Sequence, residues 1–354
     1  MRRTALIFSP IYYRHNTGKR HPESAKRLHA MITEIEKAAL LKNEKIQLVK
    51  PEKAKTTDVI LVHSAEYVNL VKAVCKSGGG FLDLQDTVVS PESFDVALYA
   101  VGGTLKAINL VMEEKFQNVF ALVRPPGHHA SRYRACGFCV FNNVAVGAEY
   151  LRRKYGLKRI LILDIDAHHG NGTQEIFYST NNVLYISLHQ DPTDFPGKGF
   201  VDEIGENEGI GYSVNIPLPF GAGDQVYLKA MDEVVEPIVR QYAPQFMLVS
   251  AGLDGHYADP VASLSLSTLC YSHVYERIVK LASEKCKGKL VSVLEGGYSL
   301  KFVGKISATI LSKMSETSYN ITDYRQKTSS NVNKQAEKVL CNIKAVLKDF
   351  WNLR

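Results

Sequence analysis

The sequence predicts an α/β fold with a central, mostly parallel β-sheet flanked by helices on both faces. Short apolar runs alternate with longer segments of helical pattern along the 354-residue chain, which is typical of a parallel sheet. Several runs, including Ile160–Leu163, are apolar at every position, as expected of strands that are buried on both faces.

Seven apolar runs are predicted as strands: Ala5–Phe8, Val119–Val123, Ile160–Leu163, Leu184–Ser187, Ser213–Ile216, Phe246–Ser250 and Leu290–Leu294. Four segments between them are long enough for helices: Ser93–Glu114, Val144–Tyr155, Asp224–Gln241 and Ser267–Ser283. The sequence has no internal repeat and no linker rich enough to divide this part of the chain. Residues 1–315 are therefore expected to form a single domain.

A polar stretch at residues 315–331 precedes a C-terminal segment with an apolar stripe. The stripe recurs at helical spacing and consists of Val339, Leu340, Ile343, Val346, Leu347, Phe350 and Trp351. Residues 316–354 are therefore expected to form a polar connection and an amphipathic helix packed on the domain. A contact with a partner or with a second copy of the chain, and hence an oligomer, is the alternative.

Composition and charge indicate an ordinary globular protein. The chain is 45% apolar and 22% charged, and its net charge of +7 is mild. No block of Lys and Arg is dense enough to predict direct nucleic-acid binding, and no apolar run is long enough to predict a membrane span. Of six cysteines, Cys136 and Cys139 form a C-x-x-C that we interpret as packing residues rather than a zinc or redox site. We expect a reduced, cytoplasmic protein.

The strongest chemical signal directly follows the predicted strand Ile160–Leu163. Two Asp and two His lie within six residues there, and unpaired ionised carboxylates are rarely buried without a function. In an extended segment Asp166 and His168 point to the same face, so both can approach one ion. Asp254 follows another predicted strand and is the candidate for a third ligand. Three such ligands leave an open position for water, as at a catalytic zinc.

Two further predicted strands also end in polar side chains. His128 and His129 follow Val119–Val123, and a tandem His pair suits proton transfer because imidazole titrates near neutral pH, although metal ligation is an alternative. Tyr298 follows Leu290–Leu294 and two glycines, and its hydroxyl is a suitable donor to a developing oxyanion. Sites in such sheets form at the carboxyl ends of strands, where all these residues are expected.

These motifs resemble the histone deacetylase family and, more broadly, the arginase/deacetylase superfamily. The superfamily includes acetylpolyamine amidohydrolases and bacterial and archaeal deacetylase-like proteins. The resemblance extends over residues 5–310 and is carried, in family order, by His21–Ser24, Arg124–Ala130, Gly137–Cys139, Asp164–Gly172, Ser187–His189, Ser250–Asp254 and Glu295–Tyr298. It implies the arginase/deacetylase fold, with residues 1–315 as the deacetylase catalytic domain.

The resemblance also implies roles for individual residues. The zinc ligands would be Asp166, His168 and Asp254, and the catalytic residues would be His128, His129, Asp164, Asn171 and Tyr298. His129 would act as general base and acid, with Asp164 behind His128 and Asn171 behind His129. The substrate tunnel would be lined by Phe138, Phe195 and Gly137.

Monovalent cations, usually potassium, are a further implication of the resemblance. One site would comprise Asp164, Asp166, His168, Ser187 and Leu188. A second would comprise Phe177, Thr180, Val183 and Tyr212. Backbone oxygens supply part of such sites.

One position separates this chain from the two-metal arginase branch. That branch needs a further carboxylate two residues after the ligand His, where this chain has Gly170, so one zinc ion is expected rather than a manganese pair. The native metal stays open between zinc and ferrous iron. The expected activity is hydrolysis of acetyl or other acyl groups from amines.

Acetyl-lysine in proteins is the first expected substrate, and acetylpolyamines or other small acyl amines are the alternative. Val261 is apolar where a polyamine-selective relative would carry Glu, which disfavours strict polyamine specificity. Asp83, Asp86 and Glu92, or Arg132 and Arg134, are expected near the tunnel mouth. The alternative to an enzyme is a catalytically silent protein that keeps the fold and binds acylated ligands.

Overall fold

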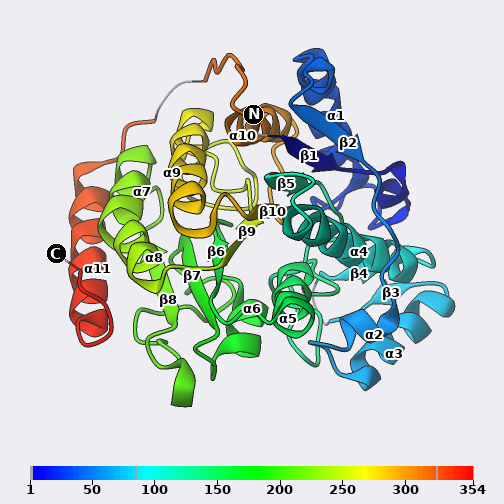
Figure 1. Ribbon diagram of the computed structural model, residues 1–354, viewed down its shortest axis with the longest axis horizontal. Helices are drawn as coiled ribbons and strands as arrows, with labels where there is room; N and C mark the ends of the chain where they lie inside the picture. Colours follow the sequence, from blue (N-terminus) through cyan, green and yellow to red (C-terminus); the bar gives the residue numbers. More distant parts are fainter. Residues whose placement is uncertain (1–2, 84–85, 324–325, 354) are drawn as a thin grey trace.

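The computed structural model describes residues 3–83, 86–323 and 326–353. Within these residues an eight-stranded, fully parallel sheet runs in the order β2-β1-β5-β10-β9-β6-β7-β8 (Figure 1). Its strands are β1 (Thr4–Ile7), β2 (Ile46–Val49), β5 (Asn118–Ala121), β6 (Ile160–Asp164), β7 (Val183–Gln190), β8 (Ser213–Leu218), β9 (Phe246–Ala251) and β10 (Leu290–Leu294). A separate antiparallel pair consists of β3 (Gly80–Phe81) and β4 (Val88–Val89).

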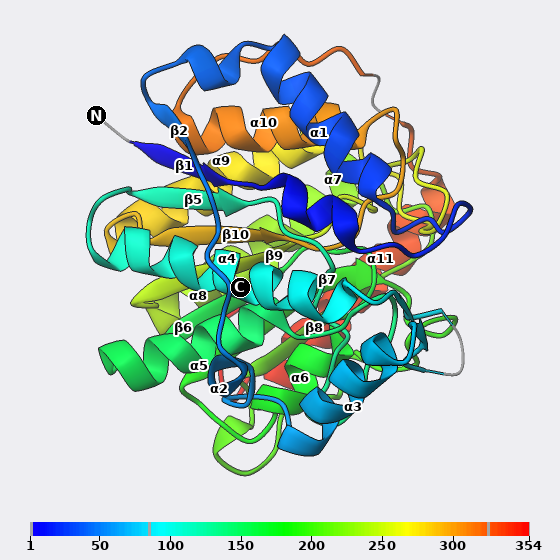
Figure 2. The ribbon, with the colours of Figure 1, turned by 90° about the vertical axis from the view of Figure 1, so that its right-hand side faces the viewer.

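Helices cover both faces of the sheet (Figures 1 and 2). One face carries α2 (Thr56–Val59), α3 (Ala65–Lys76), α4 (Ser93–Met112), α5 (Asn143–Tyr155) and α6 (Asn171–Phe177). The other carries α1 (Ala25–Lys37), α7 (Asp224–Ala230), α8 (Glu236–Tyr242), α9 (Thr268–Cys286), α10 (Val303–Ser315) and α11 (Ser330–Leu347). This arrangement confirms the predicted α/β class with a parallel sheet covered on both sides.

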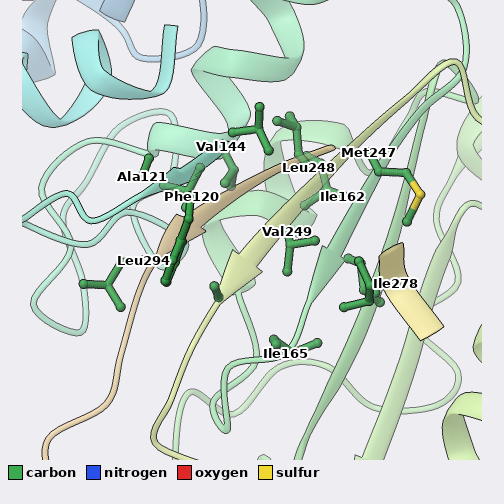
Figure 3. Packing of buried hydrophobic residues seen from close by; sticks show 14 of the residues in the cluster. Phe120, Ala121, Val144, Ile162, Ile165, Met247, Leu248, Val249, Ile278 and Leu294 are labelled. Atoms are coloured by element: carbon green, nitrogen blue, oxygen red, sulfur yellow. The ribbon is translucent and has the colours of Figure 1, made fainter. Parts of the chain in front are cut away.

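The core lies in the two layers between the sheet and the helices. Figure 3 shows side chains from central strands, such as Phe120, Ile162 and Leu248, packing together with Val144 of α5. These side chains are fully buried, and burying each stabilises the fold by roughly 1.5–3 kcal/mol. By length and composition α4 resembles a membrane span, but 78% of its apolar window is buried inside the protein. It is therefore accounted for as a core helix.

All seven predicted strands are present, whereas β2 and the β3–β4 pair were not predicted. In the edge strand β2, Gln47 and Leu48 are exposed, so its sequence lacks the continuous apolar run of the central strands. The helix predicted over Asp224–Gln241 is divided into α7 and α8 by a π-helical turn at Met231–Val235.

The C-terminal helix α11 begins within the stretch expected to be a polar connection and lies against β8 (Figure 1). Leu340, Ile343 and Leu347 of the predicted apolar stripe are buried, while Phe350 is exposed. Trp351, just past the end of the helix, is buried and donates from Nε1 to the carbonyl of Gly211 over 2.7 Å. The segment thus covers the edge of the sheet at β8.

Candidate active site

The polar motifs follow four neighbouring central strands, β5, β10, β9 and β6, whose carboxyl ends all lie at the same end of the sheet. Because the strands are parallel and hydrogen-bonded to one another, the loops that follow them meet in space. The loops contribute His128 and His129 after β5, Asp164–His169 at and after β6, Asp254 after β9 and Glu295–Tyr298 after β10. The structure therefore brings together the residues that the sequence analysis selected.

Asp166, His168 and Asp254 form a compact, buried group. Their candidate ligand atoms all lie within 4.8 Å of one another. Nδ1 of His168 is 2.9 Å from Oδ2 of Asp254 and 3.4 Å from Oδ1 of Asp166. Burial and the charge of Asp166 raise the pKa of Asp254 to about 7. Two buried carboxylates in contact require a positive counter-charge, and one nitrogen with two carboxylates is a donor set that fits zinc.

Gly170 leaves no room for a further ligand beside this group. A Cβ at this position would lie 2.6 Å from the hydroxyl oxygen of Tyr185 and 3.1 Å from Nδ1 of His128. A carboxylate here would collide with these two groups and with the carboxylate of Asp164, which is nearer still. The surroundings of Gly170 therefore favour a single ion over a metal pair.

His128 and His129 lie side by side, with ring centroids 3.9 Å apart, but their environments differ. Nδ1 of His128 is 3.1 Å from Oδ2 of Asp164, and although burial opposes its charge, Asp166 and Asp164 raise the pKa of His128 to about 10. Nδ1 of His129 is 2.8 Å from Oδ1 of Asn171. Burial and the charge of His128 hold the pKa of His129 well below its usual range. The surroundings of the two imidazoles thus shift their pKa values in opposite directions.

A cavity of about 250 Å³ opens onto His129 and His168. Its walls include the three residues predicted for a substrate tunnel, and its complete lining is Asp86, His129, Gly137, Phe138, His168, Phe195, Val261 and Tyr298. The Phe195 ring lies 5.0 Å from that of His129, and the Phe138 ring lies 5.7 Å from that of Tyr298. Two aromatic walls with polar groups at the inner end suit a narrow alkyl chain that carries a polar terminus.

Gly137 allows the two walls to approach. Its φ is +53°, and the following Phe138 also has a positive φ of 67°, so this turn is left-handed at both positions. A Cβ at Gly137 would lie 3.0 Å from Cζ of Phe195 and still closer to the ring of His129. A side chain there would therefore narrow the cavity next to His129.

Carboxylates of the site also connect the strand-end loops to one another. Each accepts a backbone N–H from a neighbouring loop, and the bonds run to Asp166 from Gly296 (2.8 Å), to Asp254 from Ala167 (2.9 Å) and to Glu295 from Gly127 (2.6 Å). These carboxylate–amide hydrogen bonds hold the loops against one another. The loops after β5, β10, β9 and β6 therefore form one connected unit.

A buried ion-pair network behind this unit was only partly foreseen. The Glu23 carboxylate binds Arg124 at 2.6 Å and Arg27 at 3.1 Å, and all three side chains are buried. Arg27 also donates to the carbonyls of Glu295 (2.5 Å) and Gly297 (2.6 Å). Glu23 and Arg124 lie in two of the motifs that carry the family resemblance, whereas Arg27 lies in none of them. Its only signal is its place one turn before Met31, on the buried face of α1.

The residues expected at potassium sites lie in two places. Asp164 of β6 is the register partner of Ser187 in β7, next to Leu188, and Asp166 and His168 follow closely. In the second set, the carbonyl of Phe177 accepts from the amide of Thr180. Val183 begins β7, and the carbonyl of Tyr212 accepts from the amide of Tyr185 in that strand. Both sets are thus local clusters along β7.

The C-x-x-C cysteines are free thiols that face each other across the turn at Gly137 and Phe138. Burial raises the pKa of the Cys136 thiol to about 11 and that of Cys139 well above its usual range. Cys139 lies within 4.8 Å of ligand atoms of His128 and Glu295, a second candidate metal group among the described residues. No second C-x-x-C or His pair at zinc-finger spacing accompanies these cysteines in the sequence, which favours the packing interpretation of this pair.

Some of the charged residues expected at the tunnel mouth line the cavity or the hollow beside it, and others do not. Asp86 lines the cavity itself, and Asp83 and Arg134 line an adjoining hollow of about 640 Å³ that shares Phe195 with it. Glu92 pairs with Arg14, and Arg132 lies over the ring of Tyr133. Val261 lines the cavity and is 36% exposed. The mouth thus combines an apolar residue with one nearby carboxylate.

Comparison with known proteins identifies the family of this chain. The histone deacetylase domain model matches residues 21–314. A probable deacetylase from Archaeoglobus fulgidus is 44% identical over 298 residues, covering 84% of this chain and 82% of the relative. A histone deacetylase-like amidohydrolase from Pseudomonas aeruginosa is 35% identical over 294 residues, covering 83% and 76%.

A solved structure extends the comparison to the fold. A crystal structure of the HDA15 HD domain has a TM-score of 0.89 and 31% identity, and the match covers 99% of this chain and 95% of that one. The expected arginase/deacetylase fold is confirmed. The chain belongs to the histone deacetylase family.

Proposed function

We propose that this protein is a zinc-dependent deacetylase that hydrolyses the side-chain amide of acetyl-lysine in peptides or proteins. One observation carries the proposal: Asp166, His168 and Asp254 form a buried ligand group at the inner end of an aromatic-walled cavity that also contains His129 and Tyr298. An extended acyl-lysine matches such a cavity because its alkyl stem is apolar and its amide is polar.

When bound by Asp166, His168 and Asp254, zinc would acidify a water molecule and polarise the amide carbonyl. Phe138 and Phe195 exclude solvent from the alkyl stem of the substrate. Neutral His129 takes the proton of the attacking water on Nε2, since its Nδ1–H is directed to Asn171.

Tyr298 donates its hydroxyl hydrogen to the oxygen that becomes negative on the amide carbon. His129 then returns its proton to the leaving amine, so that acetate and the free lysine amine are released. His128, whose pKa is raised by Asp166 and Asp164, stabilises the negative charge that develops nearby. We further propose that potassium occupies the two clusters along β7.

Two features of the mouth bear on the substrate. Val261 is apolar, which favours a peptide over a polycation. Oδ1 of Asp86 is buried and has no hydrogen-bond partner in the described part of the chain, so it can accept an N–H from a bound substrate. Because an ammonium group also meets that requirement, acetylated polyamines are the second candidate substrates.

The test is a side-by-side assay of the zinc-loaded protein on an acetyl-lysine peptide and on acetylated spermidine and putrescine, with His129→Ala as control. Peptide turnover well above polyamine turnover, abolished in H129A, supports the proposal. The reverse ratio assigns the protein to polyamines. If neither is turned over while zinc is bound, both substrate assignments are wrong and a binding role for acylated ligands is favoured.

A further inference from the structure

Asp259 lies five residues after Asp254 and holds the backbone at Tyr298. Its Oδ2 accepts the N–H of Tyr298 at 2.7 Å and that of Ser299 at 3.1 Å. Its Oδ1 accepts the N–H of Val261 at 3.0 Å. The carboxylate is nine-tenths buried, so these three donors are the main replacement for its hydration.

The segment that carries Tyr298 requires such support. Gly296 and Gly297 precede the tyrosine, and Gly297 has a φ of +115°, so two adjacent residues lack the restraint of a Cβ. Arg27 holds the carbonyl side of this turn through Gly297, and its guanidinium lies 4.9 Å from the centroid of the Tyr298 ring. Asp259 holds the amide side. Together they fix the peptide groups on either side of the Tyr298 side chain.

Only a carboxylate satisfies the pattern of donors around Asp259. All three neighbours are backbone N–H groups, and both oxygens are used. In Asn the NH₂ group would have to face either Val261 or the pair at Tyr298 and Ser299, so a donor would meet a donor. The substitution Asp259→Asn therefore keeps the shape of the side chain but removes one attachment.

We propose that Asp259 is the positioning residue of Tyr298, and that it joins the placement of the tyrosine hydroxyl to that of Val261 at the mouth. This assignment rests on the proposed deacetylase function. Val261, which is partly exposed, and Tyr298, which is buried, line the same cavity. A single carboxylate thus sets the distance between the substrate entrance and the donor to the reacting carbonyl.

A double-mutant cycle tests whether Asp259 acts through Tyr298. D259N is expected to lower kcat on the acetyl-lysine peptide roughly 10- to 100-fold with little change in KM, because the hydroxyl is misplaced for the transition state while the tunnel is kept. In a Tyr298→Phe background the hydroxyl is already absent, so D259N should lower kcat by less than about threefold. If D259N does not fold, the cycle is run with Asp259→Glu, which moves both oxygens outward by one methylene.

Asp224→Asn provides the matched control. Asp224 is a buried carboxylate that accepts from the backbone and hydroxyl of Ser267 at the start of α9, away from the cavity. D224N is expected to lower the melting temperature while leaving kcat unchanged, and zinc content is measured for every variant. Equal losses from D259N in the two backgrounds would overturn the assignment to Tyr298 alone. No turnover by the wild type would instead overturn the proposed function and this inference with it.

Discussion

Oδ1 of Asn171 faces Nδ1 of His129 at 2.8 Å, so a neutral amide rather than a carboxylate stands behind the proposed general base. The neighbouring His128 has the charged partner Asp164 instead. The pKa values of the two adjacent imidazoles also shift in opposite directions: against the effect of burial, Asp166 and Asp164 raise that of His128, whereas burial and the charge of His128 lower that of His129. The lowered pKa leaves His129 neutral and therefore able to accept a proton.

Asn171→Asp should move the acidic limb of the kcat/KM profile to higher pH. The added carboxylate stabilises the imidazolium and raises the pKa of His129, so the neutral base is lost at a higher pH. Asn181→Asp is the control, because it adds the same charge at an exposed position before the start of β7. Superimposable pH profiles for N171D and the wild type would remove His129 from the role of base.

Val261→Glu should shift the preference of the enzyme toward acetylated polyamines. A carboxylate at this half-exposed wall position attracts a cationic substrate, and with Asp86 it makes the mouth strongly negative. The ratio of kcat/KM for acetylspermidine to that for the peptide should rise about tenfold and fall with added salt. Val261→Gln is the control, because Gln has nearly the same size as Glu but carries no charge. A similar ratio for V261Q and V261E would argue against electrostatic selection at this position.

Asp254→Asn should weaken zinc binding and remove the stabilisation that zinc provides. A ligand that binds only the folded state raises stability in proportion to the logarithm of its concentration. Zinc should therefore raise the melting temperature of the wild type, and a chelator should lower it, whereas neither should affect D254N. The D224N variant should respond to zinc like the wild type. A zinc-induced shift of normal size in D254N would exclude Asp254 as a ligand.

The strands and the loops that carry the site were predictable because their signals are local. Ile160–Leu163 is apolar at each position, and Asp166 and His168 follow it within a few residues. The edge strand β2 was missed because Gln47 and Leu48 face solvent, which removes the pattern of a buried strand. The central strands could be predicted because strands that are buried on both faces consist of continuous apolar runs, which are visible in the sequence.

Arg27 and Asp259 were not singled out because they act on backbone groups of distant segments. Arg27 binds carbonyls some 270 residues later in the chain, and Asp259 binds amides 39 and 40 residues later. Every residue type carries such carbonyls and nearly all carry amides, so no motif marks the partners. Only the fold shows that both side chains converge on Tyr298.

The buried pair of Glu23 and Arg124 should make the fold sensitive to acid. Burial opposes the charge of Glu23, but Arg124 and Arg27 outweigh it and lower the pKa of Glu23 from 4.5 to about 2. Because the folded-state pKa is depressed, the stabilisation is fully present above pH 4.5 and is lost as pH falls toward 2. It amounts to about 3 kcal/mol.

Glu23→Gln tests this acid dependence. The variant should be destabilised by roughly 3–5 kcal/mol at neutral pH, because it leaves two buried guanidinium groups without their counter-charge. Its stability should also fall less steeply than that of the wild type below pH 4.5, as measured by urea unfolding over a series of pH values. Glu36→Gln, on the exposed side of α1, should leave the slope unchanged. Parallel acid slopes for E23Q and the wild type would mean that other groups cause the acid sensitivity of the fold.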